Sequence, residues 1–251
     1  MPREELSRCA PHPLDRAAAR RRRGRIDEFL AGRSLLRRLL RHVQPELSES
    51  LVETGSRGEP LLPNSSEHGV SISHDHVWVA AAFTTRGRVG VDIQTPPAQV
   101  SELFLRRCGL TGISALPGPL RAREAAWAWT AREACGKALG VGLAGRPWEF
   151  DLPPGGREGR WKECAWVSLR GESEVPLSCA VSRVPSDQGR DIKGLWLHDG
   201  HRGTNGISTR GDSLFRPAFQ AVDLSPTGRG GSLQGALGLA WSIGGEVAGL
   251  S

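Results

Sequence analysis

Residues 126–142 read Ala-Trp-Ala-Trp-Thr-Ala-Arg-Glu-Ala-Cys-Gly-Lys-Ala-Leu-Gly-Val-Gly, and this stretch decides our prediction of the fold. Its small and apolar residues suit a helix, and Gly140 and Gly142 supply the stop signal. Glu133 and Lys137 stand one turn apart at the edge of the apolar stripe. The stripe itself contains Trp127, Ala131, Ala134 and Ala138. The pattern predicts a buried helix with an acid and an amine at its margin.

The Glu133 and Lys137 pair has a plain alternative, a surface ion pair that stabilises the helix by about 0.2–0.5 kcal/mol. Composition weighs against it. The chain has 33 Lys plus Arg, and lysine occurs only at Lys137, Lys162 and Lys193. A lysine in so arginine-rich a chain indicates a need for a compact ammonium in place of a planar guanidinium.

Length and charge limit the possible classes of protein. At 251 residues the chain can form one large domain or two small ones. Its formal net charge is +6, and residues 1–50 hold 12 Arg against 7 Asp plus Glu. An N-terminal region so rich in arginine predicts a phosphate-bearing or acidic partner.

The cysteines fit neither a disulfide framework nor a zinc knuckle, because they are odd in number and lack a C-x-x-C spacing. They are Cys9, Cys108, Cys135, Cys164 and Cys179. We interpret them as reduced thiols. No run of about 18 apolar residues and no apolar segment after the arginine cluster at 20–23 occurs, so we expect a soluble cytoplasmic protein with no membrane partner.

The first part of the chain predicts helix and then strands. Residues 15–43 have the pattern of a basic amphipathic helix, which Gly24 and Gly32 weaken and could divide in two. Runs at 70–73 and 77–83 read as strands, and the second is apolar on both faces, as in a strand buried on both sides.

Asp92 lies in the next predicted strand, residues 89–94, on the face opposite Val89, Val91 and Ile93. A buried carboxylate needs a partner, which could be a metal or an arginine. Mg²⁺ takes one or two protein carboxylates, and Glu133 could supply the second if its helix packs across the strand end. A satisfied strand-end carboxylate is the structural alternative.

Two other sequence features allow further interpretations. His74 and His76 could share a strand face and bind a transition metal, although no third ligand stands at a diagnostic spacing. The arginine run at 20–23 is compatible with nucleic-acid binding or with a solvated helix face. No aromatic residues interleave with these arginines to stack on bases.

The remainder of the chain predicts a helix at 101–110, strands at 148–152, 162–169 and 175–184, and a Gly/Ser/Arg-rich tail. We expect residues 186–251 to be loosely structured, because they have few periodic apolar runs.

Four segments together resemble the motifs of the 4'-phosphopantetheinyl transferases of the type that activates surfactin synthetase. They are Gly58-Glu59-Pro60, Ser71-Ile72-Ser73-His74-Asp75, Gly90-Val91-Asp92-Ile93-Gln94 and residues 129–137 with Glu133 and Lys137. They stand in the order of the family, and the resemblance spans roughly residues 16–184.

The resemblance implies an α+β fold of two similar α/β halves related by a pseudo-twofold, with the active site in the cleft between them. We place the halves at residues 1–96, with the coenzyme A contacts and the Asp92 strand, and 97–185, with the helix of Glu133 and Lys137. The tail at 186–251 lies outside the resemblance. The pseudo-dimeric arrangement predicts a monomer.

The implied activity is that of a holo-[acyl-carrier-protein] synthase, which moves the 4'-phosphopantetheine arm of coenzyme A to a serine of an apo carrier protein and releases adenosine 3',5'-bisphosphate. Carrier domains of polyketide, nonribosomal peptide or fatty-acid synthases are the implied partners. By resemblance, Asp92 and Glu133 hold Mg²⁺, Glu133 also takes the serine proton, and Lys137 stabilises the leaving group.

Coenzyme A contacts are also implied by the resemblance. Ser73 would contact the cofactor, while His74 and Arg33 would contact its 3'-phosphate. Two positions depart from the family pattern: Gln94 stands where many members have Glu, and Glu59 replaces a basic residue. The alternatives are a family member that binds coenzyme A without turnover, and an arginine-rich nucleic-acid-binding protein.

Overall fold

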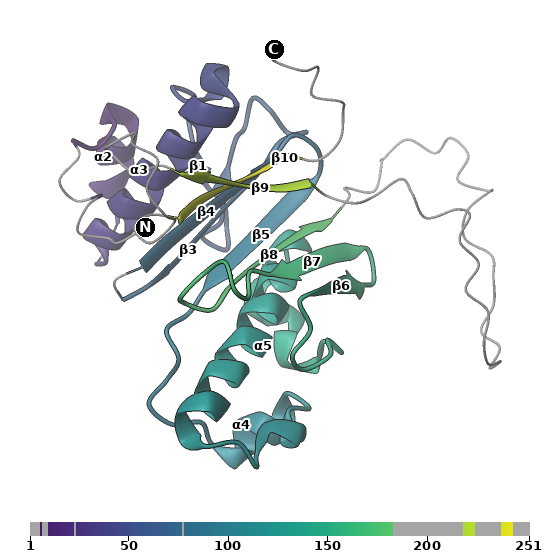
Figure 1. The fold of residues 1–251 in the computed structure, drawn as a ribbon. Coiled ribbons are helices and arrows are strands. Elements are labelled where there is room, and N and C mark those ends of the chain that lie inside the picture. The colour runs from purple at the N-terminus through teal and green to yellow at the C-terminus, as the bar shows by residue number, and fades with distance from the viewer. Residues whose placement is uncertain are drawn as a thin grey trace, which may run out of the picture.

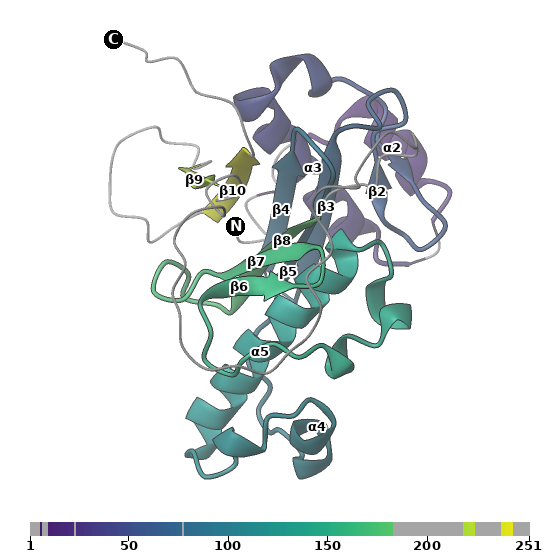
Figure 2. The ribbon, with the colours of Figure 1, turned by 90° about the vertical axis from the view of Figure 1, so that its right-hand side faces the viewer.

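The computed structural model describes residues 6, 10–22, 24–76, 78–182, 218–223 and 237–242, and it confirms a mixed helix and sheet fold. The helices are α2 (Pro13–Ala19), α3 (Ile26–Val43), α4 (Glu102–Arg107) and α5 (Gly118–Ala138). The strands are β1 (Glu53–Thr54), β2 (Pro60–Leu61), β3 (Gly69–Asp75), β4 (Trp78–Thr84), β5 (Arg88–Ile93), β6 (Glu158–Trp161), β7 (Cys164–Ser168), β8 (Leu177–Ser182), β9 (Ala218–Asp223) and β10 (Leu237–Ser242). Figures 1 and 2 show their arrangement.

The predicted N-terminal helix is two helices, and the break falls at the first of the two glycines. Gly24 and Arg25 both have positive φ, 80° and 48°, which ends the helical path between α2 and α3. Gly32 instead lies inside α3, where a Cβ would stand 2.7 Å from Ile72 Cγ2. The second glycine therefore allows α3 to pack closely on β3.

Helix α3 covers one face of the antiparallel hairpin β3–β4 (Figure 1). Four leucines of α3 are fully buried in this contact, each contributing about 1.5–3 kcal/mol by leaving water. They are Leu35, Leu36, Leu39 and Leu40. Strand β4 is buried along almost its whole length, which confirms the prediction from its two apolar faces.

Strands β5, β8, β7 and β6 form an antiparallel sheet in that order, and β5 lies beside β3. The β3–β5 contact uses side chains. Ser71 Oγ accepts a hydrogen bond from Val91 N at 3.1 Å, and Ser73 Oγ accepts one from Ile93 N at 3.4 Å. The residue numbers of both partners increase from the first hydrogen bond to the second, so β3 and β5 run parallel where they meet. Two serine hydroxyls thus join the hairpin to the sheet.

Helix α5 packs against the four-stranded sheet (Figure 2) and is buried on most of its circumference, as the sequence predicts. Gly90 permits its closest approach to β5. A Cβ there would stand 2.6 Å from Ala138 N and 2.8 Å from Lys137 Cβ, and would also clash with Ala134 O. The Gly-Val-Asp-Ile segment therefore begins with glycine because the helix backbone lies directly over it.

Two predicted strands need correction. Residues 147–149 form a 3₁₀ turn where we expected a strand at 148–152, because Arg146 is left-handed (φ 57°) and Pro147 starts the turn with its fixed φ. The strand expected at 162–169 is β7, and Lys162 (φ 52°) belongs to the turn that joins it to β6, which the sequence analysis missed.

The division at residue 96 remains a prediction, as does the pseudo-twofold. Strand β5, which we assigned to the first half, hydrogen bonds with β8 of the second. Most of residues 186–251 lie outside the described residues. Within that range β9 and β10 pair with each other, and β10 lies against β4, which the sequence analysis did not predict. Among the described residues no helix has the length and apolar character of a membrane span.

Replacing Gly90 by alanine should lower the stability of the protein by about 1–3 kcal/mol, the usual cost of overpacking a close-packed contact. Thermal unfolding would measure this as a lower Tm. Gly112→Ala is the matched control, because no atom lies within 4 Å of a Cβ built at Gly112. Equal Tm values for the two variants would contradict the close-approach explanation.

Candidate active site

Asp92 and Lys137 form the centre of the site, where β5 meets α5. Lys137 Nζ donates to Asp92 Oδ1 at 2.7 Å, to the Val91 carbonyl at 2.9 Å and to Ser73 Oγ at 3.1 Å. Asp92 is 4% exposed, so the carboxylate of this ion pair is shielded from solvent, while the Lys137 side chain is partly buried. The protein partner of the buried carboxylate is therefore the lysine, where the sequence analysis considered an arginine. The expected metal ligation by Asp92 remains a prediction.

Ser73 completes the network from strand β3. Its hydroxyl donates to Asp92 Oδ1 at 2.8 Å while accepting from Lys137. The side chain is buried at 6% exposure between the strands and the helix. Ser73 thus positions the carboxylate and the ammonium, and its predicted contact with coenzyme A remains a prediction.

Glu133 lies one helical turn before Lys137 and close enough to Asp92 for the charge of Asp92 to affect the pKa of the Glu133 carboxyl. Burial raises the pKa of the Glu133 carboxyl, and repulsion from Asp92 raises it further, while Lys137 acts in the opposite direction. Two carboxylates and one ammonium therefore share the site. Spacing predicted that Glu133 and Lys137 lie one turn apart, and the resemblance implied that Asp92 joins them. A carboxylate whose pKa is raised is better able to accept a proton near neutral pH.

The donor set of Asp92 and Glu133 fits a magnesium ion. Both side-chain hydrogen bonds that Asp92 accepts from described residues go to Oδ1, so Oδ2 is available as a ligand. Mg²⁺ prefers oxygen ligands and commonly uses one or two carboxylates together with substrate phosphates. Its charge would also relieve the repulsion that raises the pKa of Glu133. No group of three or more potential metal ligands occurs in the described part of the chain, His74 to His76 included.

Arg33 and His74 lie apart from this network, toward helix α3. His74 is on the strand face opposite Ser73, and its Nδ1 is 3.8 Å from Glu28 Oε2. Arg33 is 2% exposed and donates to Glu53 O at 2.8 Å and to Thr54 Oγ1 at 3.1 Å. These bonds attach strand β1 to α3. The structure does not bring either residue into contact with Asp92 or Lys137.

Arg33 nevertheless keeps one unused donor. Its Nη1 is buried without a hydrogen-bond partner among the described residues. Burial lowers the pKa of the guanidinium to about 10, which still leaves it charged at neutral pH. The predicted contact of Arg33 with a 3'-phosphate remains a prediction.

The two positions that depart from the family pattern have local partners. Glu59 accepts a hydrogen bond from Arg57 N at 2.9 Å and so closes the turn between β1 and β2. Gln94 follows β5, and its backbone N donates to Pro176 O at 2.9 Å. Glu59 thus stabilises its own turn.

Arg132 has a structural role that the sequence analysis did not recognise. Its guanidinium is buried and donates to four carbonyl oxygens, those of Cys108, Ala128, Phe150 and Leu152, at 2.9–3.2 Å. It thereby attaches the 3₁₀ segment after residue 146 to helix α5. No signal in the sequence distinguishes this arginine from the many exposed ones.

Two further arginines bind the C-terminal end of α5. Arg88 Nη1 donates to Leu139 O at 3.2 Å, and Arg57 Nη1 donates to Gly140 O. Cations are favourable at this negative end of the helix dipole. Because Lys137 stands in the same last turn, these contacts help to fix its position.

A strand and a helix that bring together a buried Asp and a partly buried Glu and Lys define a site suited to phosphate chemistry. Residues 88–161 match the family model described as the 4'-phosphopantetheinyl transferase superfamily. The matched range contains Asp92, Glu133 and Lys137, and it supports a transferase of the phosphopantetheinyl type. A comparison with the curated proteins finds no match.

Glu133→Gln should make the protein more stable than the wild type at neutral pH when no metal is present. A carboxyl with a raised pKa in the folded state stabilises the fold below its unfolded-state pKa and loses that contribution as the pH rises through the folded-state pKa. The variant and the wild type should therefore have similar Tm values near pH 4, and the variant the higher Tm near pH 7–8. Glu163→Gln, which removes an exposed carboxylate, should show no such divergence in thermal scans with EDTA. The prediction would be refuted if the Tm values of the wild type and both variants changed with pH in parallel.

Arg132→Lys should cost about 1–3 kcal/mol of stability, because one ammonium cannot reach the four carbonyls and leaves buried acceptors unsatisfied. Urea unfolding would measure the loss. Arg106→Lys is the control, since Arg106 is exposed on α4. A loss no larger than that of the control would show that the four bonds contribute little.

Proposed function

We propose that the protein transfers the 4'-phosphopantetheine arm of coenzyme A to a serine of an apo carrier protein, with Mg²⁺ as the metal. The observation that carries the proposal is the cluster of Asp92, Glu133 and Lys137 within the range that matches the superfamily. The likeness to the type that activates surfactin synthetase rests on the order of the four sequence segments.

In this reaction the carrier serine oxygen forms a bond to the β-phosphorus of coenzyme A, and the bond from that phosphorus to the bridging oxygen breaks. The serine proton passes to Glu133, whose raised pKa suits it as the acceptor. Adenosine 3',5'-bisphosphate leaves with the electron pair, and Lys137 neutralises the charge that develops there. Catalysis of this kind consists largely of positioning and charge stabilisation.

Asp92 and Glu133 would hold Mg²⁺, which supplies charge neutralisation on the pyrophosphate when bound. Lys137 donates three hydrogen bonds within the protein, so contact with a phosphate requires that it exchange one of them. The two halves with their pseudo-twofold, the monomeric state and the cytoplasmic location belong to this same proposal.

The proposal is tested by incubating the protein with coenzyme A, Mg²⁺ and a panel of apo carrier proteins and measuring carrier mass. A carrier should gain one phosphopantetheine group. Asp92→Ala and Glu133→Gln should each lower the rate by about 10²-fold or more, the usual contribution of a catalytic acid or base. Glu163→Gln, with its exposed carboxylate, should retain the wild-type rate.

Omitting Mg²⁺ and adding EDTA should abolish the mass gain. Coenzyme A binding without any mass gain would instead indicate a family member that binds the cofactor without turnover, and Gln94→Glu would then be the variant to assay. Carriers that gain mass equally with Asp92→Ala would contradict the roles assigned here.

A further inference from the structure

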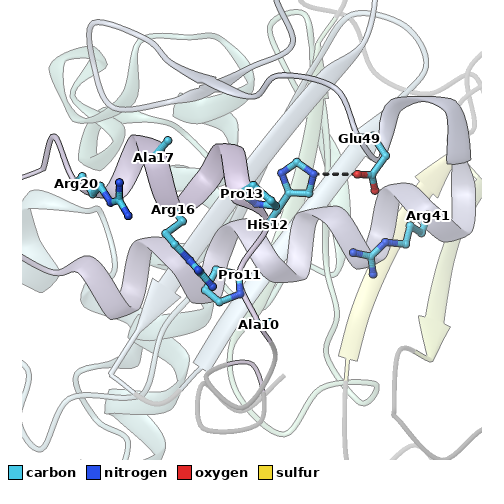
Figure 3. A pocket seen from close by; sticks show the side chains of 9 residues that line it. All are labelled: Ala10, Pro11, His12, Pro13, Arg16, Ala17, Arg20, Arg41 and Glu49. Carbon is cyan, nitrogen blue, oxygen red and sulfur yellow. Dashed lines mark hydrogen bonds and ion pairs between the residues drawn. The ribbon is translucent and has the colours of Figure 1, made fainter.

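A second site lies on the outer side of the N-terminal helices. A cavity of about 660 Å³ opens between α2, the C-terminal part of α3 and the segment at 48–50. Figure 3 shows the lining residues, with His12 just before α2, Arg16 on α2, Arg20 at its C-cap and Arg41 on α3. Its volume is in the range of pockets for small ligands.

This cavity is separate from the candidate active site. Helix α3 and the hairpin β3–β4 lie between them, because α3 packs on the hairpin face that carries Val70 and Ile72, whereas Ser73 faces Asp92 from the other side. Arg33 does not line the cavity. It precedes Arg41 by eight residues of α3, about 12 Å along the helix.

Positive charge dominates the lining of the cavity. Arg16, Arg20 and Arg41 are exposed and form no ion pair with any described residue. The single carboxylate, Glu49, already accepts a hydrogen bond from His12 Nε2 at 2.9 Å (Figure 3). His12 Nδ1 in turn accepts from Leu14 N at 3.3 Å, so the Nε2–H tautomer is held in place. Three guanidiniums are therefore available to an anion.

One buried side chain holds all three walls of the cavity together. Arg37 is 1% exposed and binds Asp15 of α2 through Nε at 2.5 Å and Nη2 at 3.2 Å. Its Nη1 donates to Ser48 O at 2.6 Å and Ser50 O at 3.1 Å. Asp15 precedes Arg16, Arg37 lies one turn before Arg41, and Ser48 and Ser50 flank Glu49. The cavity is thus preorganised, which lowers the entropic cost of binding.

We propose that this cavity binds a small phosphate-bearing ligand of nucleotide size, held by Arg16, Arg20 and Arg41. Guanidinium groups suit phosphate oxygens because their planar fork allows paired hydrogen bonds. The Pro11 and Pro13 side of the cavity offers apolar contact for the remainder of the ligand. This site is additional to the coenzyme A site of the proposed function and does not depend on it.

Calorimetric titration of the full chain with pyrophosphate and with ADP tests the proposal. Both should bind, and the Arg16→Gln/Arg41→Gln double variant should weaken both by about tenfold or more, as expected for the loss of charge-assisted hydrogen bonds. Arg106→Gln/Arg107→Gln removes the same charge from α4 and should leave both affinities within about twofold, because distant exposed charges are screened at physiological salt. If ADP binds more tightly than pyrophosphate, the ligand of the cavity is a nucleotide. If the two probes bind equally, the ligand is a phosphate compound without a nucleoside.

Several results would overturn the proposal. They are no heat with either probe, equal weakening in both double variants, and binding that saturating coenzyme A abolishes. Binding of an oligonucleotide without binding of pyrophosphate or ADP would also overturn it, in favour of a nucleic-acid surface. Circular dichroism of both double variants confirms that they fold, and coenzyme A binding by the Arg16→Gln/Arg41→Gln protein should be unchanged, which separates this site from the proposed active site.

Discussion

The ion pair between Lys137 and Asp92 is the interaction on which the arrangement of the site depends. Its ammonium joins three segments, because it donates to Asp92 and Val91 of β5 and to Ser73 of β3 while it is fixed in α5. A buried carboxylate and a partly buried ammonium are each costly to desolvate, and together they are tolerated because every donor of the lysine is used. This pair requires that α5 approach β5 closely, and Gly90 is the residue that allows it.

The same site contains an interaction that opposes folding. Glu133 and Asp92 repel each other across a partly desolvated space, and one ammonium does not cancel both charges. Such a cluster has no evident structural benefit, since a glutamine at position 133 would fill the same space without the charge. Arrangements that cost stability are common where a protein must bind cations or transfer protons. The repulsion is therefore itself an argument for a functional site.

Sequence alone predicted the members of this cluster but not how they connect. The helical spacing of Glu133 and Lys137 and the two-residue period around Asp92 placed the right side chains on the right elements. The serine bridges from β3 to β5 could not be predicted, because Ser71 and Ser73 replace a main-chain ladder with side-chain bonds. The turn at 147–149 was missed because apolar and acidic residues alternate at 148–152 as they do in a strand, and Pro147 instead starts a 3₁₀ turn. Strands β9 and β10 lie in a region whose composition gave no periodic signal.

Buried arginines explain a further part of what the sequence conceals. Three buried arginines on helices donate hydrogen bonds to backbone carbonyls of irregular or short extended segments. Arg33 binds the carbonyl of residue 53, and Arg37 binds those of residues 48 and 50. Arg132 binds those of residues 150 and 152. A guanidinium suits this task because its several donors are fixed in one plane, whereas an ammonium is a point charge. The arginine excess of residues 1–50 therefore has two uses, since Arg33 and Arg37 serve the interior and only the exposed arginines remain for an anionic partner. Lysine at position 137 fits the same reasoning, because there the three acceptors surround a single point.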